Sequence, residues 1–249
     1  MNTLDILGGK NRGGSPEPVE RVRVRSGESL AVVGPTGSGK SELLADIAQL
    51  AQGDTPSKRH VLLDGRPPLI GASGLVGTLS QRTNFVMDAD VGSFIRMHAA
   101  VLGKDGSGCV ERVLALANEL CGEPVDAVDR LQGLSGGQAR SLMIADIALI
   151  SDAPVVLIDE VENAGIDKHR ALEALTGRGK IVLTATHDPV LMLMNDRRVV
   201  MRGGGMQALI ERDGEERVRL EDLAACDAEL LTARDTLRGG GRLRREARA

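Results

Sequence analysis

The sequence predicts an α/β fold with a mostly parallel β-sheet, and two kinds of segment support this prediction. Three nearly continuous runs of β-branched and aliphatic residues are typical of central strands that are covered by helices on both faces. These runs are SLAVVG (29–34), PVVLID (154–159) and KIVLTAT (180–186). Between residues 83 and 150, apolar residues instead recur three and four positions apart, notably in 92–102 and 109–120, which favours helices. We therefore expect one domain over residues 1–249, with a helical subdomain at about 83–150 inserted in its core.

The two ends of the chain show different patterns. Residues 21–25 alternate Val22 and Val24 with arginines, and this period of two predicts a half-exposed strand in an antiparallel N-terminal part. From Met206 onward the pattern indicates a short strand and one amphipathic helix. The chain then ends in the basic run GGGRLRREARA (239–249).

Composition restricts the class of protein. The formal net charge of −4 is a poor match for nucleic acid, and a solvated tail explains the basic C-terminal run more simply than specific nucleic-acid binding. The three cysteines form no C-x-x-C pair, which suits reduced thiols. We find neither an export signal nor an apolar run of membrane-spanning length. These features predict a cytoplasmic protein, either free or peripheral on the cytoplasmic face of a membrane.

The segment 34–41, GPTGSGKS, joins a predicted strand to a predicted helix and fits the spacing G-x-x-x-x-G-K-S. Glycines let backbone N–H groups surround phosphates, and the helix directs its positive N-terminus at them. Lys40 would reach the β- and γ-phosphates, and the Ser41 hydroxyl would bind Mg²⁺. The motif therefore predicts a bound nucleotide with Mg²⁺. The other residues expected to cradle the phosphates are Gly34, Pro35, Thr36, Gly37, Ser38 and Gly39.

Two carboxylates, Asp159 and Glu160, follow the buried run at 154–158. An Asp at such a strand end can hold Mg²⁺, and a neighbouring Glu can polarise the attacking water. Acids are common at strand ends on any surface, so the interpretation depends on the phosphate loop being present as well.

Taken in order, the phosphate loop, LSQ (79–81), LSGGQ (134–138), the acidic strand end and His187 form one series. The series resembles the ATPase subunit of the ATP-binding cassette (ABC) family over nearly the whole chain. The resemblance implies a P-loop NTPase (RecA-like) core and Mg²⁺-dependent ATP hydrolysis. It also implies that two subunits pack head to tail, so that the LSGGQ loop of one caps the ATP on the phosphate loop of the other.

The same resemblance implies roles for individual residues. Gln81 would touch Mg²⁺ and the attacking water, and His187 would bridge the γ-phosphate and the catalytic machinery. Asp167, in NAGID, fits the loop through which the two sites communicate. The residues implied to contact the facing subunit's nucleotide are Ser135, Gly137 and Gln138.

The chain also departs from the family pattern near the nucleotide. No aromatic residue precedes the phosphate loop to stack on adenine. Either Lys10 or Arg12 stacks instead, or adenine is held loosely. Glu42 stands where the family usually has Thr, and we expect its carboxylate to lie close to the phosphates and to weaken ATP binding by the isolated subunit. Val161, Glu162 and Asn163 replace the Pro-Thr that usually follows the catalytic Glu.

Two biological roles remain open on the sequence alone. The first is the motor subunit of a membrane transporter, in which the segment 82–100 receives membrane-spanning subunits. That segment holds Phe85, Met87, Phe94 and Met97, which serve either as this contact or as core of the helical subdomain. The alternative role is a soluble ABC ATPase that remodels a partner protein, for example in metallocofactor assembly. The intact motifs allow a homodimer, and a second, related ATPase subunit is the alternative.

Overall fold

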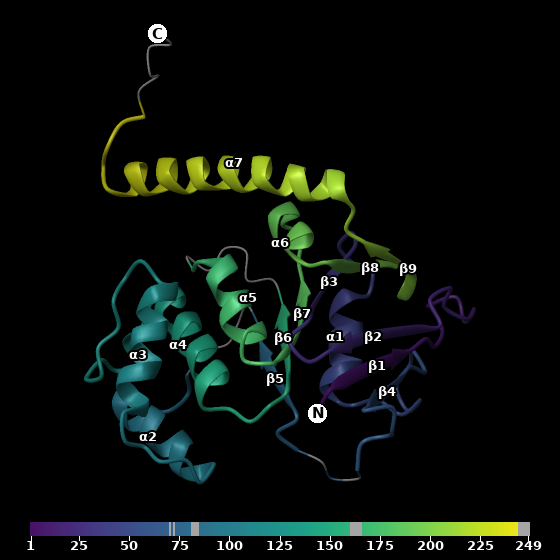
Figure 1. Ribbon diagram of the computed structural model, residues 1–249, viewed down its shortest axis with the longest axis horizontal. Helices are drawn as coiled ribbons and strands as arrows, with labels where there is room; N and C mark the ends of the chain where they lie inside the picture. The colour runs from purple at the N-terminus through teal and green to yellow at the C-terminus, as the bar shows by residue number, and fades with distance from the viewer. Residues whose placement is uncertain (70, 72, 81–84, 160–165, 244–249) are drawn as a thin grey trace.

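The computed structural model describes residues 1–249 apart from 70, 72, 81–84, 160–165 and 244–249. In this described part, six strands form one sheet in the order β5-β6-β7-β3-β8-β9 (Figure 1). Neighbouring strands are parallel, except that β9 runs antiparallel to β8. The strands are β3 (Ser29–Val33), β5 (Val76–Leu79), β6 (Val155–Asp159), β7 (Ile181–Ala185), β8 (Arg197–Arg202) and β9 (Gly205–Glu211).

The central strands of this sheet bury side chains on both faces. Along β6, Val155 and Leu157 enter one hydrophobic cluster, whereas Val156 and Ile158 enter a second. Successive side chains of a strand point to opposite faces, so the two clusters lie on opposite sides of the sheet. This arrangement explains why the sequence of these strands is continuously apolar rather than alternating.

The first cluster joins the large sheet to helix α1 and to a second, smaller sheet. In the described residues that sheet has three antiparallel strands in the order β2-β1-β4. Its elements and the helix are β1 (Thr3–Leu7), β2 (Arg21–Arg25), β4 (His60–Leu63) and α1 (Lys40–Ala48). The layer between the two sheets therefore holds the helix that follows the phosphate loop.

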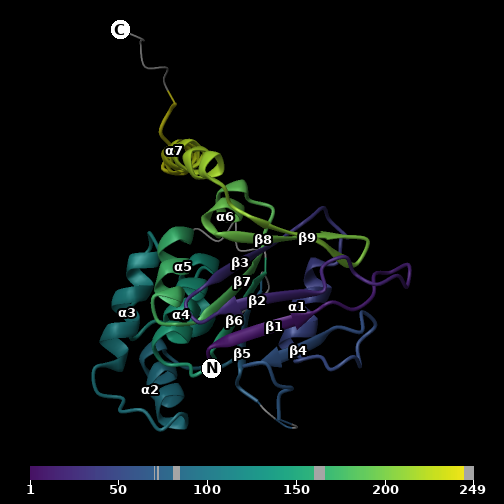
Figure 2. The same ribbon diagram turned by 45° about the vertical axis from the view of Figure 1, so that its right-hand side comes forward.

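Helices cover the opposite face of the large sheet (Figure 2). Three of them contribute to the second cluster: α3 (Cys109–Leu120), α4 (Gly136–Leu149) and α5 (Lys168–Thr176). The same α3 and α4 pack with α2 (Val91–Val101) and the short 3₁₀ helix η1 (Leu131–Gly133) around a third cluster. These four helical segments, α2, α3, η1 and α4, lie between β5 and β6 in the chain, where the sequence predicted a helical insertion.

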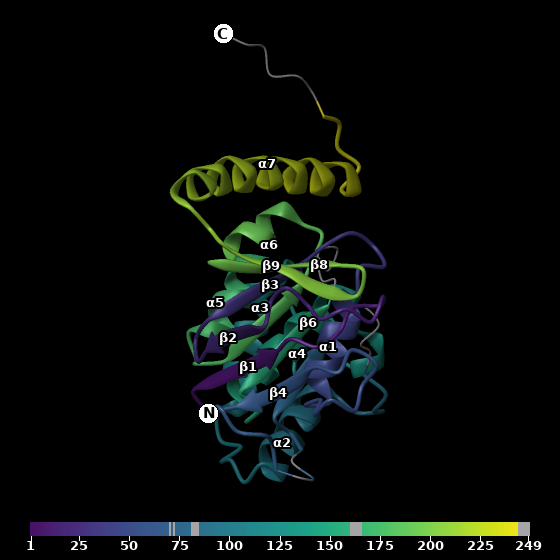
Figure 3. The same cartoon turned by 90° about the vertical axis from the view of Figure 1, so that its right-hand side faces the viewer.

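The C-terminal helix α7 (Gly214–Arg238) lies outside the layered core, across the short helix α6 (Pro189–Met194) (Figure 3). Several of its apolar side chains are exposed, namely Val218, Leu230, Leu231 and Leu237. The strand and helix expected after Met206 are thus present as β9 and α7, but much of the apolar surface of α7 remains uncovered.

The structure divides the apolar residues of the segment 82–100 between the two roles left open above. Phe85 and Phe94 pack edge to face, with ring centroids 5.0 Å apart, against the third cluster. Met87 and Met97 are instead 38% and 44% exposed. The aromatic rings therefore belong to the core of the helical region, whereas the two methionines face solvent.

One charged residue is buried in the small sheet. Asp5, in the centre of β1, is fully buried, and its carboxylate accepts hydrogen bonds from Arg21 Nε (2.9 Å) and Arg23 Nε (2.7 Å) on β2. Burial by itself would raise the pKa of Asp5, but the two arginines hold it below its ordinary value of 3.8. The predicted alternation of β2 therefore has a second function, because the exposed arginines neutralise a buried carboxylate.

We predict that Asp5→Asn lowers the free energy of unfolding by about 1–2 kcal/mol at pH 7, since the charge-assisted hydrogen bonds are lost while both arginines remain partly solvated. Because the folded-state pKa is lowered, this stabilisation is complete above pH 3.8 and is lost as the pH falls through the folded-state pKa. Urea unfolding of both proteins between pH 7 and pH 3 would measure it. A difference that stays constant down to pH 3 would contradict the assignment to the Asp5 carboxylate.

Candidate nucleotide site

The phosphate loop, residues 34–39, connects the carboxyl end of β3 to the N-terminus of α1. Gly34 requires glycine, because a Cβ there would meet the Met201 carbonyl oxygen at 2.5 Å. Gly39 also requires it, because its φ is +103° and a Cβ would lie 2.9 Å from Cα of Gly204. The loop is further held by a hydrogen bond from Gly204 N to Ser38 O (2.9 Å). The turn between β8 and β9 therefore supports the loop from behind.

Several groups of this loop are arranged to receive an anion. Gly39 is the N-cap of α1 and provides no side chain to bond the first N–H groups of the helix. The Ser38 hydroxyl is buried and has no hydrogen-bond partner among the described residues. Pro35, Thr36 and Gly37 are exposed, so the outer side of the loop is accessible. These features fit the phosphates of a nucleotide.

Lys40 is buried at the start of α1, and its ammonium group is held by its own loop and by His187. Its Nζ lies 2.9 Å from Gly34 O, 3.5 Å from Pro35 O and 2.9 Å from His187 Nε2. An ammonium group only donates hydrogen bonds, so His187 Nε2 is the acceptor and the imidazole carries its proton on Nδ1. Two of the residues expected to act on the γ-phosphate are thus in direct contact.

The sheet register places further site residues on the same edge. Val32 of β3 pairs with Ala185 of β7, and Ala185 pairs with Asp159 of β6. The carboxyl ends of these parallel strands therefore bring together the phosphate loop, the segment 186–187 and Asp159. Gln81 and Glu160 follow the neighbouring strands β5 and β6, but both lie outside the described residues. Ser41 and Glu42 occupy the first turn of α1.

The LSGGQ segment begins helix α4. Ser135 is its N-cap and forms a capping box with Gln138: Gln138 N donates to Ser135 Oγ (3.3 Å), and Ser135 N donates to Gln138 Oε1 (2.9 Å). The remaining polar contacts of these side chains are with Glu123 Oε2 (3.0 Å) and Pro124 O (2.8 Å). Ser135 is exposed, and Gly137 lies in the same first turn. In the described part of the chain, these contacts join the signature segment to its own helical region and not to the phosphate loop.

Asp167 begins helix α5. Its carboxylate accepts a hydrogen bond from Arg170 N (3.0 Å), and its own N–H donates to Leu120 O at the end of α3 (2.8 Å). The side chain is exposed. The structure thus places Asp167 where the sheet core meets the helical region.

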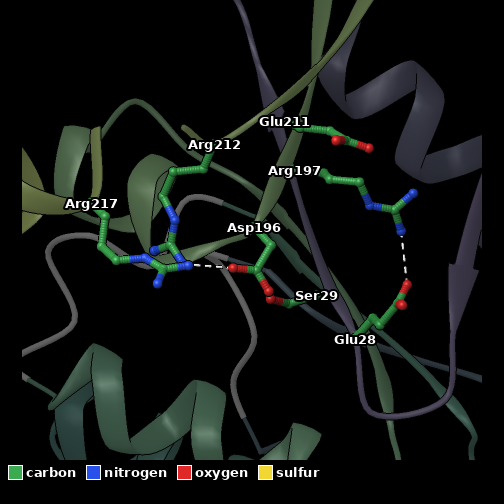
Figure 4. Close-up of a pocket in the computed structure, with 7 residues that line it drawn as sticks. All are labelled: Glu28, Ser29, Asp196, Arg197, Glu211, Arg212 and Arg217. Atoms are coloured by element: carbon green, nitrogen blue, oxygen red, sulfur yellow. Dashed lines mark hydrogen bonds and ion pairs between the residues drawn. The ribbon is translucent and has the colours of Figure 1, made fainter. Parts of the chain in front are cut away.

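A separate hollow lies at the opposite edge of the large sheet (Figure 4). It is lined by Glu28, Ser29, Asp196, Arg197, Glu211, Arg212 and Arg217. Two ion pairs cross it, Arg197–Glu28 (2.8 Å) and Arg212–Asp196 (2.6 Å). Because Ser29 and Arg197 are the first residues of β3 and β8, this hollow is at the amino ends of the strands and is not part of the nucleotide site.

A sequence model of the family described as ABC transporter matches residues 20–163. The chain belongs to the ABC transporter family. An ABC transporter ATP-binding protein of Methanocaldococcus jannaschii is 52% identical over 251 residues, covering 99% of this chain and 96% of that protein. The Nod factor export ATP-binding protein I of Neorhizobium galegae is 30% identical over 217 residues, covering 82% of this chain and 58% of that protein.

Solved structures of ABC ATPases share the fold. The first, cbiO1 of Clostridium perfringens, which is part of the ABC transporter complex cbiONQ, has a TM-score of 0.64 at 20% identity, covering 92% of this chain and 96% of that one. A dimeric ATP-binding cassette in a post-hydrolysis state, bound to ADP and Pi, has a TM-score of 0.62 at 23% identity, covering 85% and 99%. The chain is therefore an ABC-type ATPase with the P-loop NTPase fold predicted from its sequence. No helix in the described residues is long and apolar enough to cross a membrane.

The structure adds a buried ion network that the sequence did not reveal. Arg59 is fully buried, and its guanidinium bonds the carboxylates of Glu17 (2.5 Å) and Asp46 (2.8 Å) and the carbonyl of Gly204 (2.7 Å). Burial lowers the pKa of an arginine, but here the two carboxylates raise the pKa of Arg59 above its ordinary value. Gly204 is the residue that bonds the phosphate loop at Ser38. Arg59 thus supports the loop through one intervening residue.

A second unexpected contact lies in front of the loop. Arg12 Nη1 donates to Gly37 O (2.8 Å), and Arg12 Nη2 lies 3.8 Å from Glu42 Oε2. The sequence predicted that Glu42 repels the phosphates, but the ion pair places a cation beside this carboxylate and offsets part of the repulsion. Of the two residues considered for adenine stacking, Arg12 is the one whose side chain contacts the phosphate loop. Its signal in the sequence is weak, because Glu42 is 30 residues away from it.

We predict that Arg12→Ala weakens ATP binding by this ABC ATPase about fivefold at low salt, since a cation at the edge of the phosphate site contributes about 1 kcal/mol. The difference should shrink as salt is raised, because both side chains are partly exposed. Isothermal titration calorimetry would measure it, with Arg25→Ala, an exposed arginine of β2, as the matched control. Equal affinities for Arg12→Ala and Arg25→Ala would contradict a role for Arg12 in nucleotide binding.

Proposed function

We propose that this ABC ATPase hydrolyses ATP as the cytoplasmic motor subunit of a membrane transporter, with Mg-ATP bound between two subunits arranged head to tail. The head-to-tail arrangement is proposed because the signature segment LSGGQ (134–138) does not contact the phosphate loop of its own chain in the described residues. Ser135 is exposed and its contacts stay within its own helical region, so a second subunit is needed for Ser135, Gly137 and Gln138 to meet a nucleotide. An ATP-binding cassette of similar fold that is dimeric and bound to ADP and Pi supports the pairing of two subunits.

The residues at the sheet edge account for the chemistry. With nucleotide bound, Lys40 would bond the phosphate oxygens in place of Gly34 O and His187, and the His187 imidazole would face the γ-phosphate. We assign Ser41, Asp159 and Gln81 to hold Mg²⁺, which when bound would neutralise phosphate charge. Glu160 polarises the attacking water. We further propose that residues 1–249 form one ATPase domain with residues 83–150 as its helical subdomain.

The region that meets the membrane partner is assigned to the start of the helical subdomain. Val86, Met87 and Met97 are exposed there, beside the packed pair Phe85 and Phe94. Helix α2 is also tied to the signature helix α4, because His98 Nδ1 lies 2.9 Å from both carboxylate oxygens of Asp146. A movement of α2 on its partner would therefore reach the helix that caps the nucleotide.

The relatives favour a transport role over remodelling of a soluble protein. The relative that covers this chain almost end to end is an ABC transporter ATP-binding protein, and cbiO1 is part of a transporter complex. We therefore assign membrane-spanning subunits as partners and expect this chain to be peripheral on the cytoplasmic face.

We predict that Glu160→Gln binds ATP without consuming it and accumulates as a dimer, because the amide keeps the shape of the side chain but cannot polarise water. Size-exclusion chromatography with ATP should show this dimer. Adding Ser135→Arg to Glu160→Gln should return the protein to a monomer. Adding Lys40→Ala to Glu160→Gln should also give a monomer, because contacts with ATP are lost. A Glu160→Gln protein that stays monomeric at saturating ATP would exclude self-pairing and favour a related second subunit.

We predict that polytopic membrane proteins co-purify with the wild-type chain from gently solubilised native membranes, and that Met97→Asp reduces their recovery at least fivefold because a charge desolvated in an apolar contact is strongly unfavourable. Ile210→Asp, on β9, is the control for an added surface charge. Recovery of a soluble enzyme or cofactor protein instead would support the remodelling role.

A further inference from the structure

Lys168, the first residue of α5, lies at a position that is electrostatically unfavourable for a cation. The N-terminus of a helix carries a partial positive charge, so an ammonium group there requires nearby anions. Two carboxylates meet this requirement. Lys168 Nζ is hydrogen-bonded to Asp188 Oδ2 and lies 3.6 Å from Asp227 Oδ2. The side chains of Lys168 and Asp188 are only 15% and 11% exposed, so this is a largely desolvated ion pair.

The two paired residues each adjoin a residue of the nucleotide site. Lys168 directly follows Asp167, and Asp188 directly follows His187. Local bonds also hold Asp188, since its carboxylate accepts from Val190 N (2.8 Å) and its N–H donates to Thr186 Oγ1 (2.9 Å). The segment before it is joined to β3 by a hydrogen bond from Thr186 N to Val32 O (3.3 Å). The helix that Asp188 begins, α6, has only six residues, and so short a helix does not fix its own orientation.

Resting on the function proposed above, we propose that Lys168 is a positioning residue for hydrolysis. Its ion pair with Asp188 fixes the segment 186–188 against the start of α5, and so sets where His187 presents its imidazole to the γ-phosphate. Lys168 itself does not touch the nucleotide. It also couples Asp167, at the expected subunit contact, to His187 within the same chain.

The third member of this cluster extends the coupling to the C-terminal helix. Asp227 belongs to α7 and is the second anion beside Lys168. Helix α7 packs chiefly on α6, which begins after Asp188, and its first turn is also held on β8 by the ion pair between Glu216 and Arg198 (2.6 Å). Asp227 and the packing on α6 are the contacts that lead to the His187 segment. The position of α7 thus acts on the same segment as the subunit contact.

Hydrolysis by the full-length protein, measured together with ATP affinity, tests this role. Lys168→Met should lower kcat at least tenfold while the dissociation constant of ATP changes less than twofold, because the phosphate loop is untouched. Lys168→Arg, which keeps the charge, should retain at least half of the wild-type kcat. The proposal would be overturned if Lys168→Met weakened ATP binding instead of lowering kcat. It would also be overturned if Lys168→Arg lowered kcat as much as Lys168→Met.

The decisive comparison is made on a His187→Ala background. If Lys168 acts through His187, adding Lys168→Met to His187→Ala should lower kcat less than twofold. If Lys168→Met instead acts by a general loss of stability, it should lower kcat by the same factor in His187→Ala as in the wild-type protein. If His187→Ala alone leaves kcat unchanged, the proposed role of His187 in hydrolysis is contradicted. This result distinguishes a failure of the proposed function from a failure of the proposal for Lys168.

Asp227→Asn leaves the buried pair of Lys168 and Asp188 intact, and we expect this variant to fold because the Asp227 side chain is 33% exposed. We expect it to reduce kcat about twofold, and to have no further effect when combined with Lys168→Met. The matched control on α7 is Asp222→Asn, whose carboxylate pairs with Arg219 on the same helix. A change in kcat that persists on the Lys168→Met background would show that α7 does not act through Lys168.

Discussion

The buried guanidinium of Arg59 is the interaction on which the nucleotide side of this fold depends. A desolvated charge is strongly unfavourable unless it is fully paired, so Arg59 fixes the position of everything that it bonds. Its partners come from the loop before β2 (Glu17), from α1 (Asp46) and from the β8–β9 turn (Gly204). The excess negative charge of the two carboxylates is in turn offset by backbone donors, since Glu17 also accepts from Gly9 N and Met206 N.

This network explains how a glycine-rich phosphate loop can keep a defined conformation at the nucleotide site. The phosphate loop is rich in glycine, and its conformation is imposed from outside rather than by its own side chains. The β8–β9 turn bonds the loop at Ser38, and the N-terminal loop reaches it through Arg12. The Lys40 ammonium group bonds Gly34 O and His187 Nε2, so its hydrogen-bond partners come from the loop itself and from the segment after β7.

The sequence predicted the parts of this structure that follow from local pattern. The central strands were recognisable because burial on both faces leaves a continuous apolar run, and the phosphate loop because its chemistry demands a fixed spacing. Arg59 was not recognisable, since SKRH has the composition of an exposed loop and its partners are 42 and 13 residues away. The ion pair between Arg12 and Glu42 was not recognisable either, because the two residues are far apart in the sequence. The roles of Gln81 and Glu160 remain predictions from the motif alone.

The hydrogen bond between Ser135 and Glu123 has a consequence for subunit assembly. Ser135 Oγ donates to a carboxylate oxygen of the same chain, so the signature hydroxyl of a free subunit already has an anionic ligand. In the head-to-tail dimer proposed above, a phosphate from the second subunit would compete with the Glu123 carboxylate for this one donor. In that dimer, the Glu123 carboxylate would favour a triphosphate over nucleotides with fewer phosphate charges, because the stronger anion displaces it more readily.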